Sequence, residues 1–118
     1  MAKSNTKISY EKKEDILSLW RGNPSKVSVE VGDFIIDVDS RGFISGLEIL
    51  NASKNLNMNL GVLEKIESLG MSVTYKPNYV HIMLSAKLKG KDKEVSIPLT
   101  VDLGHKKVEQ EKVAFLRN

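Results

Sequence analysis

The chain of 118 residues contains no cysteine, which excludes disulfide bonds, thiolate zinc sites, iron–sulfur clusters and cysteine nucleophiles. Aromatic residues are few, with one tryptophan, three tyrosines and three phenylalanines, and they form no stacking platform among basic residues. No apolar run approaches the length of a membrane span, and the charged beginning of the chain shows no signal-peptide pattern. These absences predict a cytoplasmic protein that contacts no membrane and needs no cofactor.

Charge is also modest. The formal net charge is +3 with 28% charged residues, and only three of the basic residues are arginines. Nucleic-acid readers usually carry more arginine, because its planar fork fits phosphates and guanine edges. The basicity therefore favours a well-hydrated surface over a nucleic-acid partner.

Most of the chain alternates between apolar and polar residues, which is typical of half-buried strands. We expect an α+β fold with six to eight mainly antiparallel strands. Because Pro98 has no N–H to donate, its strand is expected at a sheet edge or at a bulge. The predicted strands form a hairpin over residues 6–21, a short strand over 27–31, a second hairpin near 34–39 and 43–50, and a meander over 71–104.

A helical pattern is confined to the middle of the chain. Apolar spacing predicts one central helix over 60–69, with Asn59 as its N-cap and Gly70 just beyond its C-terminus. Residues 51–55 indicate a turn or one extra helical turn. The length suits a single domain, residues 1–118. Within it we distinguish a β-rich half over 8–53, a turn and helix over 54–70, the meander over 71–104, and a tail over 105–118 that suits either a helix or a strand.

The acidic turn of the second hairpin allows two interpretations. Asp37, Asp39, Gly42 and Glu48 reproduce the D-x-D-x-x-G-x5-E spacing of a calcium loop. Arg41, however, occupies a position where that loop needs an oxygen ligand, and both flanks are strand-like. The favoured interpretation is a hairpin in which Asp39 begins a type I turn and Gly42 supplies a positive φ. The alternative is a metal site formed by Asp37, Asp39 and Glu48.

The remaining candidates for chemistry are basic or aromatic. His81 lies on the polar face of a predicted strand and His105 in a lysine-rich loop, so both are expected at the surface. Trp20 is expected in the core or partly covered. The meander contains a row of lysines, Lys87, Lys89, Lys91 and Lys93. These lysines would either prevent another strand from pairing with an exposed sheet edge or form a shallow nucleic-acid contact.

A family resemblance rests on the segments ISYEKKEDILSLW and VSVEVGDFIIDVDSRGFISGLEILNAS, which end in the motif G-x-x-x-G-L-E-I-L-N-A-S. From Ile8 to Ser53 this pattern resembles a small prokaryotic family catalogued as domain of unknown function 2283. The resemblance implies a compact β-rich fold and no particular activity. Among the family-like positions, we expect Glu48 to hydrogen-bond the hairpin or pair with a basic residue, and Ser53 to cap a turn. The matching residues are Tyr10, Asp15, Asp37, Asp39, Gly42, Gly46, Glu48, Ile49, Leu50, Ala52 and Ser53.

The sequence thus favours a non-catalytic protein-interaction or self-associating structural module. Exposed strand edges and an apolar tail need covering, which predicts a homo-oligomer, most simply a dimer, or another protein partner. One alternative is a nucleic-acid-binding or regulatory protein that uses the Lys87–Lys93 hairpin. The other is a metal-dependent enzyme centred on Asp37, Asp39 and Glu48.

Overall fold

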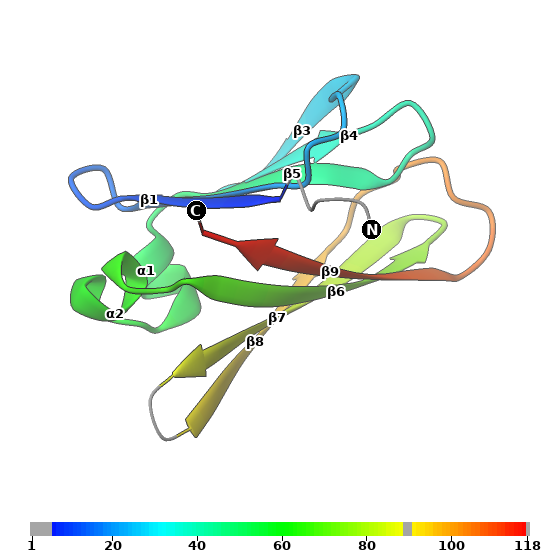
Figure 1. Cartoon of the computed structure of the whole chain (residues 1–118). Helices are drawn as coiled ribbons and strands as arrows, with labels where there is room; N and C mark the ends of the chain where they lie inside the picture. Colours follow the sequence, from blue (N-terminus) through cyan, green and yellow to red (C-terminus); the bar gives the residue numbers. More distant parts are fainter. Residues whose placement is uncertain (1–5, 89–90, 118) are drawn as a thin grey trace, which may run out of the picture.

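A computed structural model describes residues 6–88 and 91–117. Nine strands and two short helices lie in this part of the chain (Figure 1). The strands are β1 (Lys7–Glu11), β2 (Ile16–Trp20), β3 (Val27–Val31), β4 (Phe34–Val38), β5 (Ile44–Ile49), β6 (Ser68–Lys76), β7 (Tyr79–Leu88), β8 (Lys91–Leu99) and β9 (Glu109–Leu116). The helices are α1 (Ala52–Leu56) and α2 (Leu60–Glu64).

The strands form two antiparallel sheets that face each other, and the helices lie together at one end (Figure 1). The strand order is β1-β2-β5-β4-β3 in the first sheet and β8-β7-β6-β9 in the second. Alternate residues of both sheets enter one shared core, because successive side chains of a strand point to opposite faces. Its fully buried members include Leu17, Ile36, Leu47, Ile82 and Phe115.

Most predicted strands are confirmed. The first hairpin is β1–β2, the second is β4–β5, and β6, β7 and β8 form the meander. Pro98 lies in β8, which is an edge strand as expected. The tail is a strand, since β9 pairs with β6 along its length and Phe115 is buried. With β9, the strand count of the described chain is nine, one above the expected range.

The single helix expected over 60–69 is wrong. Helix α2 ends at Glu64, and Gly70 lies inside β6. Leu69 fits both patterns, but in β6 it continues the buried inner face of Met71 and Val73. Pairing with β7 on one side and β9 on the other satisfies the backbone there. Helix α1 is the extra helical turn expected after residue 51.

The start of α2 is confirmed as predicted. Asn59 has an extended backbone, and its side-chain oxygen accepts a hydrogen bond of 2.8 Å from Val62 N. No helix within the described residues is long and apolar enough to cross a membrane.

Candidate functional site

The hairpin interpretation of the acidic turn is confirmed. Asp39 N donates to Phe43 O over 2.8 Å, and Gly42 N donates to Asp39 O over 3.1 Å, which closes the turn. Gly42 has a φ of 88°, which favours glycine. A Cβ at this position would also lie 2.8 Å from Leu103 O, so glycine is required by packing as well.

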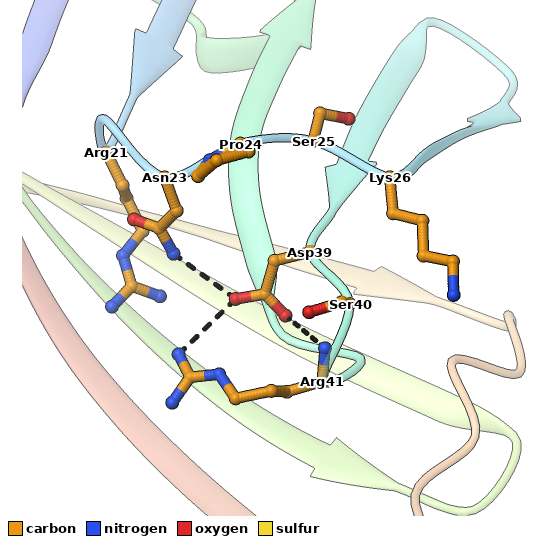
Figure 2. A pocket seen from close by; sticks show the side chains of 8 residues that line it. All are labelled: Arg21, Asn23, Pro24, Ser25, Lys26, Asp39, Ser40 and Arg41. Atoms are coloured by element: carbon orange, nitrogen blue, oxygen red, sulfur yellow. Dashed lines mark hydrogen bonds and ion pairs between the residues drawn. The ribbon is translucent and has the colours of Figure 1, made fainter.

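The Asp39 carboxylate is used by the turn itself. Its Oδ1 accepts from Arg41 N over 2.9 Å and from Phe43 N over 3.1 Å. Its Oδ2 accepts from Asn23 Nδ2 over 3.2 Å and from the Arg41 guanidinium over 3.4 Å (Figure 2). Burial raises the pKa of Asp39, but these hydrogen bonds outweigh it and hold the pKa below its usual range.

The carboxylates considered for a metal site do not form one cluster: Asp37 and Glu48 lie on the same outer face of neighbouring strands, whereas Asp39 belongs to the turn. Asp37 points to the outer face of β4, where Ser28 donates to it. Glu48 lies on β5 opposite Ile35, and Asp39 is buried in the turn. Among the described residues, no three histidine, aspartate or glutamate side chains are arranged to hold a metal ion. The structure therefore does not gather the three acids into one cluster.

The meander lysines do not share a face where they are described. Lys87 is exposed and lies opposite Asp92 across the β7–β8 pair. Lys93 lies opposite the buried Ala86, on the other face of the hairpin. Lys89 and the side chain of Lys91 lie outside the described residues.

Behind the turn, a polar network joins the two sheets. Arg21 donates to both carboxylate oxygens of Glu111 over 3.0 Å and to Ile44 O over 3.0 Å. The Tyr75 hydroxyl donates to Glu111 and accepts from Ile44 N over 2.9 Å. Burial and the hydrogen bond to Glu111 raise the pKa of Tyr75, which keeps its hydroxyl protonated. The network links the ends of β2 and β5 to β6 and β9.

The expectation that His105 lies at the surface is wrong, because only 7% of it is exposed. Its ring stacks on Tyr75 with centroids 4.5 Å apart and meets the edge of Phe43 at 5.0 Å. Nε2 contacts Gly42 O over 2.7 Å, and Nδ1 contacts the Glu109 carboxylate. The connection between β8 and β9 folds over the acidic turn, and this tertiary contact buries the ring.

Trp20 and His81 lie on the outer faces of the two sheets. Trp20 is 42% exposed with the Lys7 ammonium 5.3 Å from its ring centroid, so it is partly covered and not in the core. Its cross-strand neighbour is Gly46. His81 lies on the polar face of β7, as expected, where its Nε2 contacts Ser96 Oγ over 2.5 Å.

Three of the family-like positions meet in one cluster, which we call the Asp15 clamp: Tyr10, Asp15 and Ser53. The Asp15 carboxylate accepts from the Tyr10 hydroxyl over 2.6 Å, from Ser53 Oγ over 2.7 Å and from Ser53 N over 3.0 Å. Burial and the hydrogen bond to Asp15 raise the pKa of Tyr10 to about 12. The clamp fastens the β1–β2 turn to the start of α1. Ser53 fixes this helix start by donating hydrogen bonds to Asp15, a residue distant from it in the sequence.

A cavity of about 630 Å³ lies between the β2–β3 connection and the acidic turn (Figure 2). Sequence reasoning missed it, because residues 21–26 and 39–41 are brought together only by strand pairing. Its lining residues are Arg21, Asn23, Pro24, Ser25, Lys26, Asp39, Ser40 and Arg41.

Ser45 offers a test of the packing beside this site. Its Oγ is fully buried and has no hydrogen-bond partner among the described residues. A buried hydroxyl without a partner costs free energy. We expect Ser45→Ala to leave the free energy of unfolding unchanged or to raise it by up to about 1 kcal/mol. Urea denaturation would measure this, and a loss above about 1 kcal/mol would contradict it.

Two comparisons found similar proteins. The chain is 39% identical over 69 residues to an uncharacterized protein, MJ0789, of Methanocaldococcus jannaschii, an alignment that covers 54% of this chain and 60% of that protein. No solved structure matches the chain. The sequence model of the family described as Protein of unknown function (DUF2283) matches residues 7–53. This match spans the five strands of the first sheet and the whole Asp15 clamp. Residues 7–53 of the chain are thus similar to DUF2283, which confirms the resemblance carried by the segment from Ile8 to Ser53.

Proposed function

We propose that this protein is a non-catalytic interaction module that self-associates by pairing the β3 strands of two copies. The observation that carries the proposal is the open edge of β3, the last strand of its sheet. Val27 is 52% exposed, and Val29 and Val31 are only partly buried against the core. An apolar edge strand with unpaired backbone groups is a template for another strand.

The other edge strands carry more charged residues or proline than β3 does, including Lys7 and Glu11 in β1 and Glu109 and Lys112 in β9. At the side formed by β1 and β9, Leu116 N donates to Thr6 Oγ1 over 3.3 Å. Strand β8 carries Asp92, Glu94 and Pro98, and both charges and proline discourage strand addition. Strand β3 has the sequence VSVEV, with Glu30 as its single charged residue.

A two-fold axis through Val29 would pair two β3 strands without a charge conflict. In this antiparallel register, Val27 lies opposite Val31 of the second copy, and Ser28 lies opposite Glu30. Such an interface is isologous, as in the commonest homodimers. The pairing would join the first sheets of two copies into one continuous sheet.

The non-catalytic role in this proposal is supported by the hydrogen bonds of two carboxylates. The carboxylates of Asp15 and Asp39 each accept several hydrogen bonds from the fold itself. A general base must instead be within reach of a substrate proton with its lone pair free. These two carboxylates therefore act as structural acceptors.

Placing a lysine on the β3 edge is expected to dissociate the dimer. Val27→Lys removes two symmetric valine contacts, each worth about 1.5 kcal/mol, so the dissociation constant should rise roughly a hundredfold. Sedimentation equilibrium would measure it, with the dimer at twice the 13.2 kDa of the chain. Val27 is exposed, so the variant should fold.

The matched control is Ser96→Lys, an exposed position on the edge strand β8. It should leave the dimer unchanged. A mass of one chain for the unaltered protein at millimolar concentration would overturn the proposal. Equal weakening by both substitutions would do the same, since it would indicate a general charge effect.

A further inference from the structure

The outer face of the first sheet presents a tryptophan and several carboxylates to solvent. Figure 1 shows the second sheet and both helices on the other side of this sheet. The strand pairings place two neighbouring rows of residues across the outer face. The first row is Lys7, Trp20, Gly46, Asp37 and Ser28, and the second is Ser9, Ser18, Glu48, Ile35 and Glu30.

Trp20 lies near one end of the first row. It is the single tryptophan of the chain and is 42% exposed. Its ring already attracts a cation, because the Lys7 ammonium lies 5.3 Å from the ring centroid. Lys7 is exposed and belongs to the edge strand β1, so its flexible side chain can be displaced. The ring is therefore placed to meet a cation that arrives from solvent.

The face around Trp20 is acidic, although the whole chain has a net charge of +3. Its strand positions hold one cationic residue, Lys7, and four carboxylates, which are Glu11, Glu30, Asp37 and Glu48. None of the four carboxylates forms an ion pair within residues 6–88 and 91–117. A surface with an excess of one charge attracts a partner of the opposite charge.

Two of these carboxylates lie close to the tryptophan because the residue between them and the ring is glycine. Asp37 and Trp20 flank Gly46 from its two sides, and a Cβ on Gly46 would lie 3.1 Å from Asp37 Oδ2. Glu48 follows two residues along β5 and projects from the same face. An aromatic ring with carboxylates beside it can hold a guanidinium by stacking and by ion pairing.

We propose that this surface, which we call the Trp20 face, docks a basic segment of a partner protein. An arginine or lysine of that segment replaces Lys7 on the ring, and further cations of the segment pair with Asp37 and Glu48. Charge complementarity selects this occupant, since the carboxylates repel nucleic acids and acidic peptides. The site goes beyond self-association and does not require it, because Val29 and Val31 of β3 pack toward the core on the opposite face.

Trp20 fluorescence reports binding directly, because the chain has no other tryptophan. An end-capped hexa-arginine peptide should change the emission of the full chain saturably, and an end-capped hexa-glutamate peptide at the same ionic strength should not. Glu30→Gln with Glu48→Gln should weaken hexa-arginine binding by about two- to fivefold for each carboxylate, as is usual for exposed ion pairs. Trp20→Leu, measured by isothermal titration calorimetry, should weaken it by about fivefold.

Lys7→Gln should have the opposite effect. It should tighten hexa-arginine binding by about two- to fivefold, because the ring loses its internal cation. A folding defect would not tighten binding, so this variant keeps the test decisive. The charge-matched control, Asp92→Asn with Glu94→Gln, removes two exposed carboxylates from β8 and should keep the affinity within about twofold.

The proposal is overturned if hexa-arginine gives no saturable change, if Lys7→Gln does not tighten binding, or if the control loses as much affinity as Glu30→Gln with Glu48→Gln. Preferential binding of hexa-glutamate would also overturn it. In the Val27→Lys variant, which blocks β3 pairing, the emission should be independent of protein concentration. A concentration dependence there would overturn the proposal as well, since a second copy would then cover the Trp20 face.

Discussion

Replacing Glu111 with alanine is expected to lower the free energy of unfolding by about 3 kcal/mol. The carboxylate holds both Arg21 and the Tyr75 hydroxyl at the junction of the two sheets. Its removal leaves the Arg21 side chain, which is only 20% exposed, without its countercharge. Breaking a buried ion pair costs about 3–5 kcal/mol, and the partial exposure of this pair places the effect at the lower end.

A double-mutant cycle with Tyr75→Phe separates the hydrogen bond from the ion pair. Tyr75→Phe alone should cost about 2 kcal/mol, because it leaves the buried Ile44 N–H without its acceptor. The coupling energy between the two positions should be at least about 1 kcal/mol, since they share one hydrogen bond. Urea denaturation of the four proteins gives all terms.

The matched control for the loss of a carboxylate is Glu94→Ala at an exposed position of the edge strand β8. We expect its effect to stay within about 0.5 kcal/mol. The proposed role of Glu111 would be contradicted by a loss no larger than that of Glu94→Ala.

Asp15→Asn is expected to destabilise the protein by about 2–3 kcal/mol, because it weakens the hydrogen bonds from Tyr10 and Ser53 to a charged acceptor. Asp15 has a φ of 56°, a conformation that asparagine also tolerates, so this substitution tests the charge and not the backbone. The measurement is the free energy of unfolding in urea at neutral pH.

Asp15→Gly distinguishes the clamp from simple turn chemistry. Glycine adopts a positive φ at no steric cost. If position 15 needed only this backbone conformation, the variant would be as stable as the unaltered protein. If the carboxylate holds Tyr10 and Ser53, as we predict, Asp15→Gly loses at least as much stability as Asp15→Asn.

The same clamp gives a pH dependence with a definite sign. Burial raises the pKa of Asp15, but the hydrogen bonds from Ser53 and Tyr10 outweigh it, so the pKa stays below its usual value. A carboxyl with a lowered folded pKa stabilises the fold above its unfolded pKa of about 3.9 and loses that contribution as pH falls through the folded value. Asp15→Asn should therefore flatten the loss of stability below about pH 4, leaving the slope that arises from other carboxyls, including Asp33 and Asp39.

Local sequence patterns predicted the strands well where apolar and polar residues alternated with a clear two-residue period. The apolar alternation in β7 and β8 matches their buried faces, and the Asp39–Gly42 turn forms as its residue types indicated. The prediction of a helix beyond Glu64 is wrong because Leu69 fits a helical stripe as well as the buried face of a strand. The pairing of β6 with β7 and β9 decides that this segment is a strand and not a helix. A short stretch of sequence carries no information about that pairing.

The candidate site depended still more on tertiary contacts. Tyr10, Asp15 and Ser53 were recognised as family-like positions, but their contact requires the β1–β2 turn to meet the start of α1. His105 is buried because a distant connection covers the acidic turn, and the cavity exists because residues 21–26 lie beside residues 39–41.

The sequence by itself thus determined an antiparallel β-rich fold, the acidic hairpin and the cap at Asn59. Only the tertiary structure decided the two-sheet arrangement, the strand in the tail, the network around Glu111 and the cavity beside the acidic turn. The physical reason is that alternation of residue types records which face of a strand is buried. Strand order, which brings distant side chains together, depends on how whole sheets pack.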